Sequence, residues 1–135
     1  MKDILNNAIK FREGFRPFAT SVLEEEAAKI FELSNSDKIY FMEKVAKVIK
    51  NWQKKITSVT HADNIARVQT VSKKINQKFY NLIHDFYKIT KVPLLINTSF
   101  NLNGEPIVCS PNDAIRTFYS CGLDILVIGD YVVEK

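Results

Sequence analysis

Three short stretches of the sequence gather residue types that can bind an anion. The first, KFREGFRPF at residues 10–18, places Lys10, Arg12 and Arg16 close together where a predicted helix gives way to a predicted strand. In an extended segment, alternation would put Lys10 and Arg12 on the same side. An arginine can hold a phosphate or carboxylate through two parallel N–H bonds, and a lysine adds charge. Solvated charge, with Glu13 as the ion-pair partner, is the alternative.

The second stretch, THADNIARVQ at residues 60–69, contains an arginine at the start of an apolar strand. Arg67 stands between Ala66 and Val68, and arginine rarely occupies such a position unless it is paired. Its partner is either a bound anion or a buried carboxylate. His61 and Asp63 do not make a metal site, because zinc or iron needs three or more ligands. We interpret His61 as a capping or core hydrogen-bonding residue.

The third stretch, NTSFNLNGEP at residues 97–106, follows a predicted apolar strand. Ligands of open α/β sheets usually lie beyond the C-terminal ends of strands. The hydroxyls, amides and glycine of this loop, Ser99 and Asn101 among them, can direct several donors at phosphate oxygens. A simple turn is the alternative, since Asn and Gly favour turns. The sequence has no phosphate-binding glycine loop and no nucleophile-elbow motif, so catalytic residues stay unassigned.

The elements that must position these residues follow from periodicity and capping signals. We expect a first helix capped by Asp3 that ends before Gly14, a strand over 19–22, a short helix over 24–31 and a turn over 33–37. Residues 39–49 are ambiguous, with strand-like alternation. Further along we expect strands over 66–71, 92–97 and 125–128, the last continued by 131–133. A helix is predicted after the cap Asn76, and its buried face consists of Phe79, Leu82, Ile83, Phe86 and Ile89. Another is predicted after the cap Ser110, and its buried face consists of Ala114, Ile115, Phe118 and Tyr119. Gly122 is expected to end the second of these helices.

This order predicts an α/β fold with a twisted mixed sheet and flanking helices. The 135 residues fit a single domain over 1–135. No apolar run reaches the roughly 20 residues that span a bilayer, and no signal-peptide core is visible, so we interpret the protein as cytoplasmic. Cys109 and Cys121 fit reduced, packed thiols. The net charge of +4 favours anionic partners, although a nucleic-acid surface is not expected, since the aromatics do not alternate with the basic residues.

The three stretches also resemble a known family. The segments LNNAIKFREGFRPFATS (5–21), THADNIARVQTV (60–71) and INTSFNLNGEPIVCSPNDAIRTF (96–118) are similar in order and spacing to segments of the NodU/CmcH-type O-carbamoyltransferases. The resemblance covers essentially the full chain. It implies a YrdC-like fold, as in threonylcarbamoyl-AMP synthases, of which this chain would be the C-terminal part. The family pattern KxR…SxN falls on Lys10, Arg12, Ser99 and Asn101, and Arg67 joins the same pocket.

The resemblance implies a two-step chemistry. The YrdC-like domain would bind carbamoyl phosphate and ATP, accompanied by Mg²⁺, and form carbamoyl-adenylate. A separate N-terminal metal-containing domain would then pass the carbamoyl group to an acceptor hydroxyl. This chain itself would hold no metal.

The chain also departs from the family pattern. The family's earlier GPRALGNRS segment is not in this sequence, so we expect a fragment or truncated form that needs a partner. Thr20 stands where the family tends to have Pro, and Asn64 where it has Gly, which bears on the turn beside Arg67. Two other functions stay open: a non-catalytic nucleotide- or RNA-binding module of the same fold, and an assembly domain that docks onto another subunit.

Overall fold

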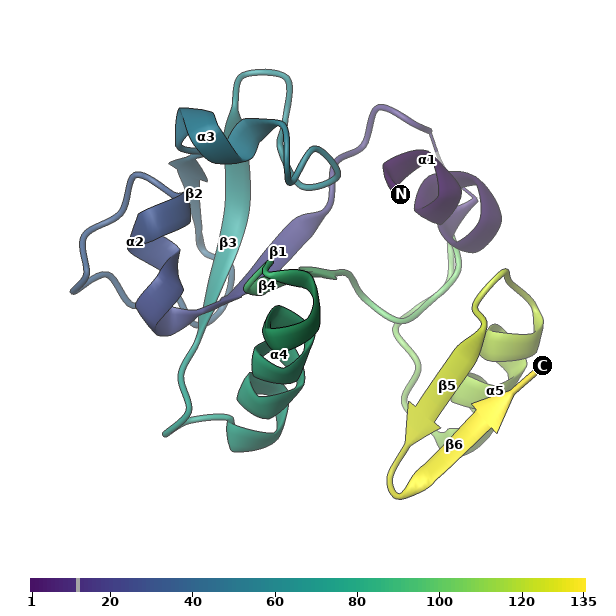
Figure 1. The fold of residues 1–135 in the computed structure, drawn as a ribbon. Helices are drawn as coiled ribbons and strands as arrows, with labels where there is room; N and C mark the ends of the chain where they lie inside the picture. Colours follow the sequence, from purple (N-terminus) through teal and green to yellow (C-terminus); the bar gives the residue numbers. More distant parts are fainter. Residues whose placement is uncertain (12) are drawn as a thin grey trace. The chain divides into compact units, whose positions relative to one another are not determined.

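The computed structural model describes residues 1–11 and 13–135, and the chain divides into two compact units (Figure 1). The sheet unit comprises Pro17–Thr98, and the hairpin unit comprises Met1–Arg16 with Ser99–Lys135. Arg12, predicted above as a site residue, lies outside the described residues. The single domain expected over 1–135 stays a prediction.

The sheet unit is built on a mixed sheet in the order β2-β3-β1-β4. The central strand β1 (Ala19–Leu23) runs parallel to β3 (Ile65–Val71) and antiparallel to β4 (Leu94–Asn97), and β2 (Lys44–Lys47) pairs antiparallel with β3. All five residues of β1 are buried, as expected for a strand covered on both faces. The predicted α/β class with a mixed sheet is confirmed.

The ambiguous segment before β2 is mostly irregular. Residues 39–43 form no strand, yet Ile39 is fully buried beside β3, where its N–H donates to Thr70 Oγ1 at 2.9 Å. The N–H of Thr70 donates in turn to the Ile39 carbonyl at 2.7 Å. The alternating pattern therefore predicted a strand correctly over Lys44–Lys47, but not over the apolar run before it.

Short helices follow β1 and β2 in the sheet unit. The 3-10 turn η2 (Glu24–Glu26) leads into α2 (Ala27–Ile30), which confirms the helix expected over 24–31. A further turn, α3 (Lys50–Gln53), follows β2. The N–H of Ile49 donates to the Ile30 carbonyl at 2.9 Å, so the start of α3 is attached to the end of α2.

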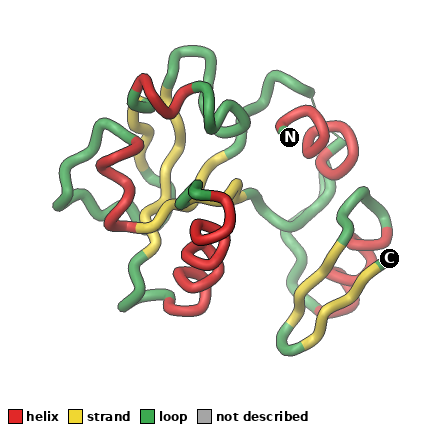
Figure 2. Tube along the Cα trace, viewed as in Figure 1, coloured by secondary structure: helices red, strands yellow, loops and turns green. Residues whose placement is uncertain are grey.

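The long helix α4 (Gln77–Thr90) covers one end of the sheet (Figure 2). Its predicted cap is confirmed, because the Asn76 side chain accepts from the Phe79 N–H at 3.1 Å. Its buried face is rotated from the prediction. The core there consists of Ile83, with Leu23 and Val71 of the sheet, and the partly buried residues packed against it are Phe79, Tyr80, Tyr87 and Leu95. The predicted core residues Leu82, Phe86 and Ile89 are exposed.

The hairpin unit begins with α1 (Lys2–Ile4), which continues into the π-helix η1 (Leu5–Lys10). The predicted cap at Asp3 is wrong: the residue before α1 is Met1, and Asp3 lies inside the first turn. The prediction that the helix ends before Gly14 is confirmed. Phe11 follows η1 in the left-handed conformation, with φ 47°, so the extended backbone expected at Lys10 and Phe11 is not found.

The rest of the hairpin unit is α5 (Pro111–Tyr119) and the hairpin of β5 (Ile125–Ile128) and β6 (Tyr131–Glu134). The predicted cap of α5 is confirmed, because Ser110 Oγ accepts from the Asp113 N–H at 3.2 Å. The chain reverses after β5 at Gly129, whose φ of +58° suits glycine. The expectation that 131–133 continues β5 is therefore wrong.

The core of the hairpin unit is smaller than predicted. Ala114, Phe118 and Leu126 form the buried cluster. Ile115 and Tyr119, expected in the core, are exposed, whereas Thr117 is buried. No helix among the described residues is long and apolar enough to cross a membrane.

Candidate functional site

Lys10 lies at the end of η1 and reaches a loop that is far away in sequence. Its side chain is 5% exposed. The Nζ donates to the backbone carbonyl of Ser99, to the Asn101 carbonyl at 3.0 Å and to Asn101 Oδ1 at 2.9 Å, with Ser99 Oγ at 3.5 Å. The hairpin unit thus brings together Lys10, Ser99 and Asn101.

The loop around Lys10 is ordered by its own hydrogen bonds. Ser99 Oγ donates to Asn101 Oδ1 at 2.6 Å, and Asn101 Nδ2 donates to the Glu105 carbonyl at 2.7 Å. These contacts fix which end of the Asn101 amide accepts and which donates. The ammonium group therefore sits among oxygens whose dipoles point toward it, and an anion that contacts it must replace one of them.

Two residues hold the helix that presents Lys10. Gly122 donates its N–H to the Ala8 carbonyl at 2.8 Å, and a Cβ at Gly122 would meet that oxygen at 3.0 Å. Gly122 was expected to end α5, but the residue capping α5 is Ser120. Its lack of a side chain serves this close approach instead. The buried Asn6 donates to the carbonyls of Arg16 at 3.1 Å and Gly14 at 3.4 Å, which attaches the following loop to η1.

The predicted arginines are in different situations. Arg67 lies in β3 opposite Val45 of β2, and its side chain is exposed. Within residues 1–11 and 13–135 its guanidinium has neither an ion pair nor a hydrogen bond, so the buried-carboxylate alternative is not found there. Arg16 forms an exposed ion pair with Glu13 at 2.9 Å, so for this residue the alternative of solvated charge with Glu13 as the partner is found.

The turn before Arg67 accommodates Asn64. Asn64 has φ +60°, a left-handed conformation that Asn adopts more readily than most residues. Its N–H donates to the His61 carbonyl at 3.0 Å, and the N–H of His61 donates to the Ile65 carbonyl at 2.8 Å. Asn64 in place of glycine is therefore compatible with a tight turn leading into β3.

A polar row on the sheet was missed from the sequence. Ser21 Oγ donates to Gln69 Oε1 at 2.6 Å, and Asn97 Nδ2 donates to Ser21 Oγ at 2.9 Å and to Gln69 Oε1 at 3.1 Å. Gln69 is two residues from Arg67 in β3, so both point to the same face of the sheet. Single polar residues inside apolar strands were the available signal, but their pairing needed the strand register.

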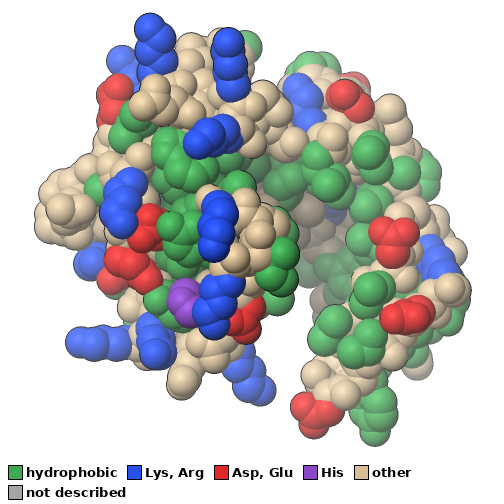
Figure 3. Space-filling view, in the orientation of Figure 1, with side chains coloured by type: hydrophobic (Ala, Val, Ile, Leu, Met, Phe, Trp, Pro, Cys, Tyr) green, Lys and Arg blue, Asp and Glu red, His purple; other side chains and the backbone are tan. Residues whose placement is uncertain are grey.

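The described residues include no group of three or more His, Cys, Asp or Glu that could hold a metal ion. The positive charge lies mainly on the sheet unit, where Figure 3 shows most of the visible Lys and Arg side chains. Fold and charge together define an α/β protein with a candidate anion site.

Comparison with known proteins identifies the family. The family model described as carbamoyltransferase C-terminus matches residues 1–135, and the chain belongs to this family. It is 50% identical over 135 residues to nodulation protein NolNO of Sinorhizobium fredii, with 99% of this chain and 20% of that protein covered. It is 46% identical to nodulation protein NolO of Bradyrhizobium diazoefficiens, with 99% and 25% covered.

A third relative shows a shorter match. Nodulation protein U of Sinorhizobium fredii is 41% identical over 105 residues, which cover 78% of this chain and 18% of that protein. The chain spans a quarter or less of the length of these three relatives.

Proposed function

We propose that this chain acts within an O-carbamoyltransferase, where it binds carbamoyl phosphate and ATP through Lys10, Arg12, Arg67, Ser99 and Asn101. The observation that supports this most directly is the convergence of Lys10 with Ser99 and Asn101, which are 89 and 91 residues away in the sequence. A cation, a hydroxyl and an amide in one place can bind a carbamoyl group and a phosphate oxygen together.

The proposed formation of carbamoyl-adenylate has two steps. Hydrolysis of carbamoyl phosphate gives carbamate and inorganic phosphate. A carbamate oxygen then bonds to the α-phosphorus of ATP, and pyrophosphate leaves. Mg²⁺ would accompany ATP, mainly through phosphate oxygens and water. The acceptor hydroxyl would react with carbamoyl-adenylate in a separate, metal-containing domain, and we propose a cytoplasmic location because ATP is available there.

The residues of this chain would contribute charge and orientation. Arg67 is exposed with no partner among the described residues, so its guanidinium is available for two parallel bonds to a phosphate. Lys10 would supply positive potential and order the loop. Ser99 and Asn101 would orient the carbamoyl or α-phosphate group. Such fixed donors stabilise charge that spreads over phosphate oxygens during adenylate formation.

Isothermal titration with carbamoyl phosphate and with ATP tests the proposal. A charge-assisted hydrogen bond contributes about 1.5–3 kcal/mol, so Arg67→Ala should weaken binding at least tenfold, and Arg12→Ala likewise. Lys78→Ala, which removes an exposed charge from the first turn of α4, is the matched control and should change the affinity less than twofold. If neither ligand binds even to a longer chain that includes the region preceding these residues in the relatives, the proposal is wrong.

A non-catalytic RNA-binding module is the second candidate. Five exposed lysines of the sheet unit favour it: Lys44 and Lys47 of β2, Lys50 of α3, and Lys54 and Lys55 directly after α3. RNA binding that weakens steeply with salt, with no response to Arg12→Ala or Arg67→Ala, would support this module over the enzyme.

A further inference from the structure

A pocket lies in the sheet unit beyond the C-terminal ends of the two parallel strands β1 and β3. Its volume is about 510 Å³, within the range of small-molecule sites. Glu24 and Glu25 directly follow β1, and Lys73 and Lys74 come just after β3. In open α/β sheets, ligands usually bind beyond the carboxyl ends of the strands. The pocket is therefore not at the other end of β1, where Ala19 pairs with Asn97 of β4.

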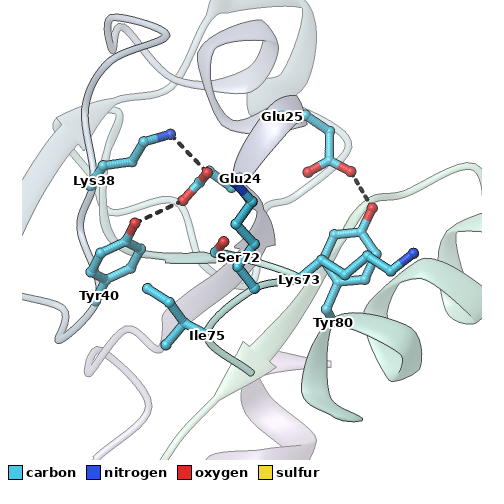
Figure 4. Close-up of a pocket in the computed structure, with 9 residues that line it drawn as sticks. Glu24, Glu25, Lys38, Tyr40, Ser72, Lys73, Ile75 and Tyr80 are labelled. Atoms are coloured by element: carbon cyan, nitrogen blue, oxygen red, sulfur yellow. Dashed lines mark hydrogen bonds and ion pairs between the residues drawn. The ribbon is translucent and has the colours of Figure 1, made fainter. Parts of the chain in front are cut away.

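The acidic groups of this pocket are already engaged (Figure 4). Glu24 pairs with Lys38 Nζ at 2.7 Å and accepts from the Tyr40 hydroxyl at 3.2 Å. Glu25 accepts a hydrogen bond from the Tyr80 hydroxyl. That bond raises the pKa of Tyr80 to about 12, so the phenol remains neutral. The carboxylates are thus occupied, although their oxygens keep lone pairs for further donors.

The two basic residues after β3 are not engaged. Within the described part of the chain, the ammonium groups of Lys73 and Lys74 have no hydrogen bond and no ion pair, and both side chains are exposed. Glu25 keeps its negative charge, since the hydrogen bond from Tyr80 comes from a neutral phenol; with Glu24 paired to Lys38, the three lysines and two glutamates that line the pocket leave a net charge of +1. The rings of Tyr40 and Tyr80 and the side chain of Ile75 line the same pocket and supply its apolar surface.

We propose that this pocket binds a small phosphate monoester on a hydroxyl-bearing body, such as a sugar phosphate. Lys73 and Lys74 neutralise the phosphate as point charges. The ligand's hydroxyls donate to the free lone pairs of Glu24 and Glu25, and its body packs on the tyrosine rings. This site shares no residue with the proposed carbamoyl phosphate and ATP site, so either proposal can fail while the other holds.

Isothermal titration of the 135-residue chain with glucose 6-phosphate and ribose 5-phosphate tests the site. We expect saturable binding of at least one of the two sugar phosphates, weaker binding of inorganic phosphate and no binding of glucose. The double variant Lys73→Gln/Lys74→Gln should lose at least tenfold in affinity. Lys50→Gln/Lys54→Gln, with the same change in charge in α3 and at the residue that follows it, should lose less than twofold.

Two further measurements show whether the sugar phosphate binds in this pocket. Arg67→Ala should leave sugar phosphate binding unchanged, because Arg67 does not line the pocket. Unchanged thermal midpoints of both double variants would show that they fold. The inference is overturned if neither sugar phosphate binds saturably to the unmodified chain, or if both double variants reduce the affinity equally.

Discussion

Replacing Lys10 by methionine would test whether its ammonium group organises the loop that contains Ser99 and Asn101. Methionine keeps most of the apolar stem and removes the charge and all three donors. The Asn101 carbonyl and the Ser99 carbonyl then lose their bonds to Nζ, whereas Asn101 Oδ1 keeps the Ser99 hydroxyl at 2.6 Å. A bond to a charged donor contributes about 1.5–3 kcal/mol, and water can replace the one at the exposed Ser99. The bond at the Asn101 carbonyl is the one left without compensation, so we expect a local loss of about 1.5–3 kcal/mol.

Amide hydrogen exchange measures this loss where it occurs. The Val108 N–H donates to the Phe100 carbonyl at 3.0 Å and closes the same loop. A loss of about 1.5–3 kcal/mol corresponds to exchange at Val108 that is roughly 10- to 150-fold faster. The Thr70 N–H, which bonds to Ile39 in the sheet unit, should exchange at its original rate. Tryptophan fluorescence is unsuitable, because the single tryptophan, Trp52, is in the sheet unit.

A small effect would refute this reasoning. If Lys10→Met accelerates exchange at Val108 by less than about threefold, the oxygens around Nζ do not depend on the ammonium for their order. The control is Lys50→Met, which removes an exposed ammonium from α3. It should leave Val108 unchanged. Equal acceleration in both variants would also contradict a specific role of Lys10.

Two further predictions concern the supports of the two sites. Gly122→Ala puts a Cβ at 3.0 Å from the Ala8 backbone, so we expect the free energy of unfolding measured in urea to fall by about 1–3 kcal/mol. Gly14→Ala, whose Cβ meets nothing closer than 4.0 Å, should lower it much less. Equal losses would contradict the close approach of Gly122 to Ala8 as the reason for glycine there. The bond to Glu25 raises the pKa of Tyr80 to about 12, above the value of about 10 in the unfolded chain. The bond therefore stabilises the fold fully below pH 10, and this stabilisation is lost as the pH rises through 12. Tyr80→Phe should remove this part of the alkaline loss in thermal midpoints between pH 9 and 12, and an unchanged pH profile would show that the bond does not contribute.

The starts of the two longest helices, α4 and α5, could be predicted because capping signals are local, whereas the cap predicted at Asp3 was wrong. Ser110 and Asn76 cap their helices as expected. The buried face of α4 could not be predicted in the same way. Its sequence contains two overlapping helical stripes, and the sheet selects the one with Tyr80, Ile83 and Tyr87, whose hydroxyl-bearing rings can lie at the edge of the core. Which stripe is buried depends on the sheet, so periodicity alone cannot decide it.

The arrangement of the strands was harder to predict than their existence. The order of the elements predicted one twisted mixed sheet, but β5 pairs with β6 in a separate two-stranded sheet. A strand pattern specifies burial, not the partner strand. The same limit applies to Ser21, Gln69 and Asn97, which are single polar residues in the sequence and one hydrogen-bonded row once register is known.

The contacts of Lys10 also change how an anion would be held at the predicted site. The sequence predicted both Lys10 and Arg67 as cations of the anion site. In the structure the Lys10 ammonium is surrounded by loop oxygens, whereas Arg67 is exposed and without a partner in the described residues. An anion oxygen that bonds to the Lys10 ammonium must displace one of these loop oxygens. The net gain in binding free energy is then the difference between the new charge-assisted bond and the lost one. At Arg67 the anion replaces water alone. Under the proposed function, Arg67 would therefore contribute more of the direct binding energy than Lys10, and Lys10 would act chiefly by fixing the positions of Ser99 and Asn101.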